Sequence, residues 1–238
     1  MVLTPASLLP PNENKRLETL RTYDILHSLR EPLFTDVVEV IALLFNVPIS
    51  LIALVDANEV EYKATYGLPE LCRQPRVEAI CSMAVGQQQA IVFTDLRRAD
   101  SLTPEAAAAA RVKGLLFYAG VPLCMPNRQC IGTLCIIDQQ ARAFSEPEER
   151  VLEQFAHVVE RLIAVRQYCR AGQEPGEGHW ALVRTELEQE VRSLMTLVRY
   201  LGKYSSTHIP VPSDALEAVD RRLVAFRWML ADYYPGPL

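Results

Sequence analysis

The sequence lacks the features that mark membrane, secreted and nucleic-acid-binding proteins. Its 238 residues contain no window of eighteen uncharged apolar residues, and the opening stretch MVLTPASLLPPNENKR has no basic segment followed by an apolar run of signal length. Positive charge is not in excess, because the formal net charge is −5 and lysine and arginine are scattered rather than clustered. We therefore expect a cytoplasmic protein with no membrane and no nucleic acid as partner.

Motifs of catalysis and metal binding are also missing. The sequence contains no HExxH, P-loop or GxGxxG pattern and no CxxC pair of the kind that structural zinc sites use. Six cysteines without a secretory signal are expected to be reduced thiols. Histidines number four and lie far apart: His27, His157, His179 and His208. We predict no metal, no cofactor and no catalysis.

Three of the cysteines, Cys124, Cys130 and Cys135, fall within twelve positions of one apolar segment. Side chains alternate between the two faces of a strand, so Cys130 and Cys135, five apart, are expected on opposite faces. Two hairpin registers stay open. In one, Cys124 shares a face with Cys135 at a distance of about 13 Å, and in the other Cys124 opposes Cys130. Neither register gathers all three, so the segment is predicted to be a piece of core.

Hydrophobic residues make up 50% of the chain, which is enough for a substantial core, and their spacing predicts mixed secondary structure. Asn12 or Asn14 can cap a first helix, and Thr103 followed by proline and glutamate is a strong helix start. The predicted helices are 13–27, 33–45, 77–85, 103–113 and 146–169, and the predicted strands are 48–55, 59–67, 90–95 and a hairpin over 117–138.

The C-terminal part is predicted to be a helical hairpin. The stretch RAGQEPGEG at 170–178 is typical of a linker, and two apolar stripes of helical spacing follow it. Each stripe must be buried against something, so we expect an antiparallel hairpin or a dimer seam. His179 could be a phosphoacceptor, but the residues after it lack the usual acidic, arginine and proline pattern, which favours a linker histidine. The expected division is 1–12 extension, 13–169 main α/β-containing domain, 170–179 linker and 180–238 hairpin.

Six segments resemble, in order, those of the GAF domain, a small-molecule-sensing fold of bacterial signalling proteins. The first is VPISLIALVDANEVEYKATYGL at 47–68, with Asp56, Lys63, Gly67 and Leu68, and the second is PRVEAIC at 75–81. The others are VFTDL (92–96), FYAGVPL (117–123), IGTLCIID (131–138) and FSEPEERVLEQFAHVV (144–159). The resemblance covers about residues 13–168. It implies an α+β fold with a central antiparallel sheet flanked by helices, followed here by a C-terminal α-helical hairpin.

In such a fold, the terminal helices would pack on one face of the sheet and a ligand pocket would lie on the other. The resemblance implies four ligand-binding candidates, Cys81, Tyr118, Thr133 and Cys135, although for each of them a place in the core is the favoured alternative. Bilin attachment is disfavoured because Ser82, rather than histidine, follows Cys81, and the Cys-x-His of a bacterial subgroup is Cys81-Ser82-Met83 here. The ordered signature of cyclic-nucleotide binders is absent.

Three functional interpretations follow from this resemblance. The preferred one is a non-catalytic sensor or regulator in intracellular signal transduction, with an unknown small-molecule ligand and a helix-mediated homodimer or signalling partner. A thiol-dependent reductase of free methionine sulfoxide is the second, with Cys72 and Cys81 as its nearby thiols. The third is an interaction scaffold whose pocket is filled by side chains.

Overall fold

The computed structural model describes residues 8–23, 25, 31–68, 73–171, 176–205, 210–234 and 236. Its helices are α1 (Glu13–Thr22), α2 (Pro32–Phe45), α3 (Ile80–Gln87), α4 (Pro104–Val112), α5 (Glu146–Ala171), α6 (Gly176–Ser205) and α7 (Ser213–Tyr233), with short 3₁₀ turns η2 (Arg76–Glu78) and η3 (Leu96–Arg98). Its strands are β1 (Ile49–Val55), β2 (Glu59–Tyr66), β3 (Arg73–Pro75), β4 (Ile91–Phe93), β5 (Phe117–Cys124) and β6 (Cys130–Asp138). The predicted helices and strands occur in the predicted order, and one further strand, β3, was not predicted.

The strands form one six-stranded sheet in the order β3-β2-β1-β6-β5-β4, and every neighbouring pair is antiparallel. Strand β1, ISLIALV, is buried at all of its positions. A strand that is apolar on both alternating faces requires a cover on both sides, which places it in the middle of a layered fold. The predicted α+β class with a central antiparallel sheet is therefore confirmed.

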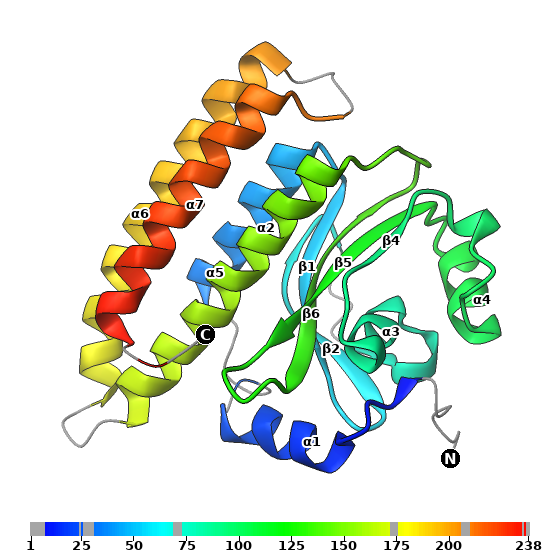
Figure 1. Cartoon of the computed structure of the whole chain (residues 1–238), viewed down its shortest axis with the longest axis horizontal. Coiled ribbons are helices and arrows are strands. Elements are labelled where there is room, and N and C mark those ends of the chain that lie inside the picture. Colours follow the sequence, from blue (N-terminus) through cyan, green and yellow to red (C-terminus); the bar gives the residue numbers. More distant parts are fainter. Residues whose placement is uncertain are drawn as a thin grey trace.

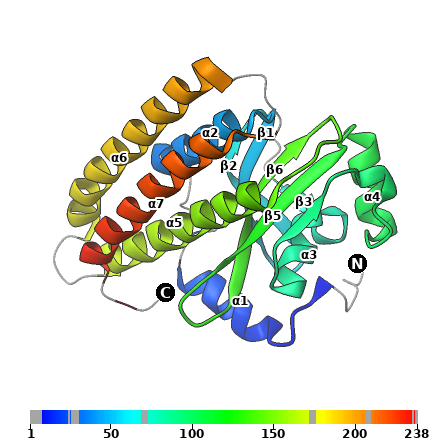
Figure 2. The ribbon, with the colours of Figure 1, turned by 45° about the horizontal axis from the view of Figure 1, so that its top comes forward.

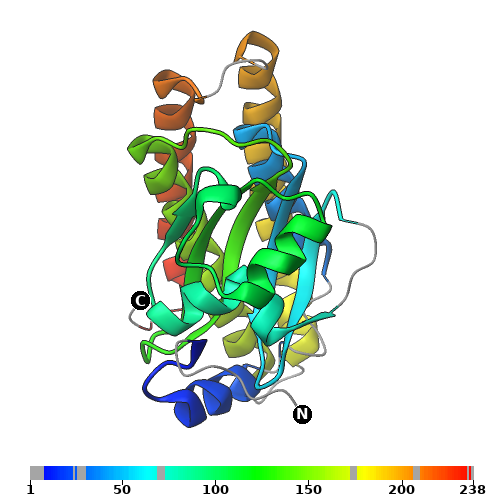
Figure 3. The same ribbon diagram turned by 90° about the vertical axis from the view of Figure 1, so that its right-hand side faces the viewer.

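Helices cover both faces of this sheet. Figure 1 shows α2 and α5 on one face and α3 and α4 on the other, and Figure 3 shows α3 and α4 from their own side. The core on the α2/α5 side includes Phe45, Leu134 and Phe155, and the smaller core on the α3/α4 side includes Leu51, Cys81 and Cys135. No described helix is both long and apolar enough to cross a membrane.

Local capping explains where several helices begin. Thr103 accepts a hydrogen bond from the backbone N–H of Ala106 and starts α4, as predicted. At α5, the Ser145 hydroxyl accepts from the Glu148 N–H while the Glu148 carboxylate accepts from the Ser145 N–H, which is a capping box. Asn12 precedes α1 but its side chain makes no capping bond, and the predicted end of that helix at His27 lies outside the described residues.

The C-terminal hairpin packs on the rest of the same chain. Helix α7 lies along α5 and α6 lies along α2, so the hairpin forms an outer layer over these two helices (Figure 2). Trp180 of α6 is almost fully buried, and its Nε1 donates to Glu31 Oε2 at 2.8 Å while Arg166 Nε of α5 donates to Glu31 Oε1 at 2.6 Å. The apolar stripes are thus buried within one chain, which removes the sequence argument for a dimer seam.

The cysteine-rich hairpin corrects one expectation. Cys124 pairs with Cys130 across β5 and β6, the second of the two predicted registers, and the two are joined by a disulfide rather than being reduced thiols. The strict alternation used in the prediction is broken by an irregularity between Leu123 and Cys124. Cys135 is a free, buried thiol that contacts Cys81. Among the described residues, no group of three or more His, Cys, Asp or Glu could hold a metal ion.

Candidate functional site

A cavity of about 370 Å³ lies between the sheet and the two helices α3 and α4. Its walls are mostly apolar and come from both layers; they include Ile49, Leu51, Ile80, Ala106, Ala110 and Ile137. The alanine run of α4 leaves space between this helix and the sheet, because each alanine side chain is a single methyl group. A cavity of this size and apolar character is typical of small-molecule sites.

A small group of polar side chains lies at one side of the cavity. Tyr62 Oη and Lys113 Nζ each donate to Gln74 Oε1 at 2.6 Å, and Gln74 Nε2 donates to the backbone oxygen of Glu78 at 2.8 Å. Burial lowers the pKa of Lys113, although the charges of Glu78 and Cys81 oppose this effect. Sequence reasoning missed Gln74 and Lys113, because β3, which carries Gln74, is only three residues long.

The structure brings the four predicted site residues together around one thiol. Cys81 of α3 and Tyr118 of β5 line the cavity, whereas Cys135 and Thr133 of β6 are fully buried and are not among its lining residues. The Sγ atoms of Cys81 and Cys135 are 3.8 Å apart, so one thiol can donate to the other. Cys72, the other thiol considered beside Cys81, lies outside the described residues.

This arrangement shifts the pKa values of the two thiols in opposite directions. The hydrogen bond from Cys135 lowers the pKa of Cys81 from 9.0 to about 7; burial opposes the shift, and Thr133 and Tyr118 add to it. Burial raises the pKa of Cys135 well above its ordinary value, and the neighbouring Cys81 raises it further. The hydroxyls of Tyr118 and Thr133 are buried and have no hydrogen-bond partner among the described residues. Each is a donor without an acceptor.

A family model for the GAF domain matches residues 29–163, more than half of the chain. The chain belongs to the GAF domain family. A cyclic di-GMP phosphodiesterase of Pseudomonas aeruginosa is 27% identical over 154 residues, which cover 63% of this chain and 25% of that protein. The chain therefore spans about a quarter of the length of this curated relative. Membership of the GAF family supports a sensory or regulatory role.

Two solved structures align with part of this chain. The GAF domain of an Acinetobacter phosphoenolpyruvate-protein phosphotransferase aligns with a TM-score of 0.48 and 19% identity, over 63% of this chain and 94% of that one. A type II free methionine-R-sulfoxide reductase from Thermoplasma acidophilum aligns with a TM-score of 0.47 and 15% identity, over 59% of this chain and 95% of that one.

In this GAF domain, Gly120 makes room for the ring of Tyr118. A Cβ atom at position 120 would lie 2.3 Å from Tyr118 Oη, so the ring extends along β5 over the glycine. Gly120 is also paired with Cys135 of β6, which brings the Tyr118 hydroxyl toward the thiols. The tyrosine and glycine two positions apart in FYAG were a signal for this packing, since residues two apart share a strand face.

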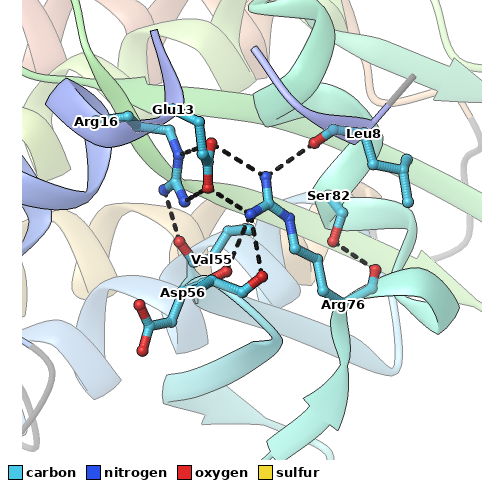
Figure 4. A network of polar contacts seen from close by, with 8 residues as sticks. Leu8, Glu13, Arg16, Val55, Asp56, Arg76 and Ser82 are labelled. Atoms are coloured by element: carbon cyan, nitrogen blue, oxygen red, sulfur yellow. Dashed lines mark hydrogen bonds and ion pairs between the residues drawn. The ribbon is translucent and has the colours of Figure 1, made fainter. Parts of the chain in front are cut away.

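A buried arginine fixes the position of α3, one of the helices that line the GAF cavity. Figure 4 shows Arg76 donating to the backbone oxygen of Leu8, to the carboxylate of Glu13 and to the oxygen of Asp56. Its own backbone oxygen accepts from the Ser82 hydroxyl of α3 at 2.7 Å. The helix that carries Cys81 is thereby joined to α1 and to the β1–β2 turn. This contact gives the Ser82 side chain a structural role beside Cys81.

Proposed function

We propose that the protein is a non-catalytic sensor of a small molecule, which binds in the cavity between the sheet and helices α3 and α4. The observation that carries this proposal is a mostly apolar space of about 370 Å³ that is lined by Tyr118, whose buried hydroxyl has no hydrogen-bond partner among the described residues. Buried donors without a partner cost free energy, and a ligand acceptor would satisfy this one.

The walls define the ligand chemistry. Apolar side chains on both layers fit an apolar body, and the Tyr62, Gln74 and Lys113 group on one side fits a polar end that accepts hydrogen bonds. The cavity volume limits the ligand to the size of a small metabolite. In this proposal Cys81 and Tyr118 contact the ligand directly, and Thr133 and Cys135 support them.

The signal would cross the sheet. Tyr118 and Cys135 belong to the core on the cavity side, whereas Ala119 and Leu134, next to them in β5 and β6, belong to the core that contains α5. A ligand that shifts these strands therefore changes the packing of α5 and of the hairpin beyond it. Differential affinity of about 1–3 kcal/mol between two arrangements is sufficient for useful coupling. We propose that a partner protein or a second copy of the chain, in the cytoplasm, detects this change at the outer helices.

Native mass spectrometry of the full chain, purified from its own host, tests the proposal. We expect the wild type to retain a small molecule. Ala109→Phe should lose it, because the new ring fills the cavity. Ala108→Phe should retain it, because Ala108 is exposed on α4. Equal retention in both variants, or no retained molecule together with no thermal shift from a metabolite collection, would refute it and favour a scaffold. The same spectra report the oligomer mass, which tests the predicted homodimer.

The reductase interpretation has its own test. Turnover of free methionine sulfoxide by the wild type, and its loss in Cys81→Ser, would replace the sensor proposal with an enzymatic one.

A further inference from the structure

The two thiols beside the cavity form a pair that ligand binding alone does not require. Their Sγ atoms are 3.8 Å apart, although the residues are 54 positions apart and belong to different layers, α3 and β6. A disulfide needs a separation of about 2.0 Å. The gap of roughly 2 Å can be closed by a small approach of α3 to the sheet.

We propose that Cys81 and Cys135 form an oxidisable dithiol site, in which a small hydroperoxide entering the cavity oxidises Cys81 and Cys135 then closes a disulfide with it. This proposal goes beyond ligand sensing, because it assigns a covalent reaction to the cavity and uses a reactive molecule in place of a ligand that binds reversibly.

Position assigns the two thiols their roles. Cys81 lines the cavity and meets any molecule within it, whereas Cys135 is fully buried beside Cys81 and does not line the cavity. The first oxidation therefore occurs at Cys81, and Cys135 acts as the resolving thiol. Acidity supports the same order, since the pKa of Cys81 is lowered to about 7 and that of Cys135 is raised.

The two unpartnered hydroxyls complete the site. Tyr118 Oη and Thr133 Oγ1 have no hydrogen-bond partner among the described residues, and both side chains lower the pKa of Cys81, which means that they stabilise its thiolate. The same donors can stabilise the oxygen that develops charge as the O–O bond breaks. Their presence turns an otherwise costly buried anion into one with hydrogen-bond partners.

The reaction balances with the hydroperoxide as oxidant. The Cys81 thiolate attacks the terminal oxygen of ROOH, so that the S–O bond forms, the O–O bond breaks and the alcohol leaves with a proton. This step gives a sulfenic acid at Cys81. Cys135 Sγ then attacks the Cys81 sulfur, the S–S bond forms, the S–O bond breaks and water leaves with the remaining proton. Two thiols supply two electrons, and ROOH becomes ROH and water.

Other described cysteines provide internal comparisons. Cys169 is a free thiol buried in the helical core, where burial raises its pKa, and Cys124 and Cys130 are already joined. At pH 7, a thiol of pKa about 7 is about half ionised, a thiol with an ordinary value is about 1–3% ionised, and a thiol with a raised value is ionised still less. We therefore expect Cys81 to be oxidised at least tenfold faster than Cys169.

The experiment treats the full chain at pH 7 with one equivalent of hydrogen peroxide or, in a separate arm, tert-butyl hydroperoxide. Free thiols are then alkylated, and peptides are mapped without reduction. We expect a peptide pair joined through Cys81 and Cys135 in at least one arm. In Cys135→Ser, the sulfenic acid at Cys81 should persist and be trapped by dimedone, and in Cys81→Ser the Cys135 thiol should stay free.

A further variant tests the hydroxyl directly. Tyr118→Phe removes a buried donor without a partner, so the fold should be retained or slightly stabilised. The pH midpoint for alkylation of Cys81 should nevertheless rise, a result that a purely structural role for the hydroxyl would not produce.

Three results would overturn the proposal. The first is a peptide that joins Cys81 to Cys72 rather than to Cys135, and the second is oxidation of Cys169 at the same rate as Cys81. The third is an unchanged Cys81 at hydroperoxide concentrations that oxidise Cys169. No ligand is added in these measurements, so their failure leaves the sensor proposal standing, and an empty cavity leaves the dithiol proposal standing.

Discussion

Replacing Glu13 by glutamine should destabilise the fold, and the loss should depend on pH. Glu13 lies between two guanidinium groups, those of Arg16 and Arg76, whose side chains are 1% and 0% exposed (Figure 4). The variant keeps the shape of the side chain but leaves two buried cations without this carboxylate. Removing one partner of a buried ion pair is strongly destabilising because the remaining charge is left uncompensated.

The magnitude follows from the acidity of Glu13. Burial alone would raise its pKa, but hydrogen bonds from Arg16 and Arg76 outweigh burial and lower the pKa from 4.5 to about 2. A change of this size corresponds to about 3 kcal/mol between the two protonation states. Since 19% of the side chain is exposed and solvent screens part of the interaction, we expect a loss of about 2 kcal/mol.

The sign of the pH dependence follows from the direction of the shift. A carboxylate whose pKa is lowered on folding stabilises the protein fully above the unfolded value of 4.5, and this stabilisation is lost as the pH falls toward 2. The free-energy difference between wild type and Glu13→Gln should therefore be constant from pH 7 to about pH 5. It should shrink steadily below pH 4.5, because the unfolded wild-type chain takes up a proton at Glu13 there, while the folded carboxyl becomes neutral only near pH 2.

Urea unfolding followed by far-UV circular dichroism at pH 7, 5, 4 and 3 measures this difference. Glu59→Gln is the matched control, because Glu59 pairs with Arg73 at 3.5 Å with both side chains more than half exposed. Exposed pairs of this kind contribute about 0–1 kcal/mol. A deficit of the same size at pH 7 and pH 3, or a deficit no larger than that of the control, would show that the carboxylate charge does not hold the network together.

Further predictions concern the C-terminal hairpin and the packing of Tyr118 on Gly120 beside the cavity. Trp180→Ala should lower the free energy of unfolding by about 3–5 kcal/mol, because it leaves a void and removes the hydrogen bond to Glu31. Trp228 on α7 is 74% exposed, so Trp228→Ala should change the free energy of unfolding by less than about 0.5 kcal/mol. Similar losses from both tryptophans would contradict the docking of α6. Gly120→Ala should cost about 1–3 kcal/mol, because its methyl group displaces the Tyr118 ring, and adding Tyr118→Leu should recover part of the loss in thermal unfolding. No recovery would show that the strain lies in the backbone.

Much of the fold was predictable because its signals are local. The capping box at Ser145 and Glu148, the threonine before α4 and the doubly apolar strand β1 each lie within a few consecutive residues. Strand β3 escaped prediction because three residues, Arg73–Pro75, are too few to show a period. The disulfide between Cys124 and Cys130 required the hairpin register, which turns on an irregularity that alternation cannot reveal.

The candidate site was predictable in part. Cys81, Tyr118, Thr133 and Cys135 were named from the family resemblance, but periodicity does not say that the thiols of Cys81 and Cys135 touch. Gln74 and Lys113, 39 positions apart, could not be paired from their sequence neighbourhoods. In each case the missing information is the relative placement of two layers.

Short-range patterning thus defined the longer helices and strands and the apolar side of each, because these properties depend on residues a few positions apart. Only the folded chain decided what each apolar side meets. The hairpin covers α2 and α5 of its own chain, and α3 lies against β6 so that two distant thiols meet beside a cavity. These contacts depend on how well whole layers pack against one another, and the spacing of apolar residues within one segment carries no information about that packing.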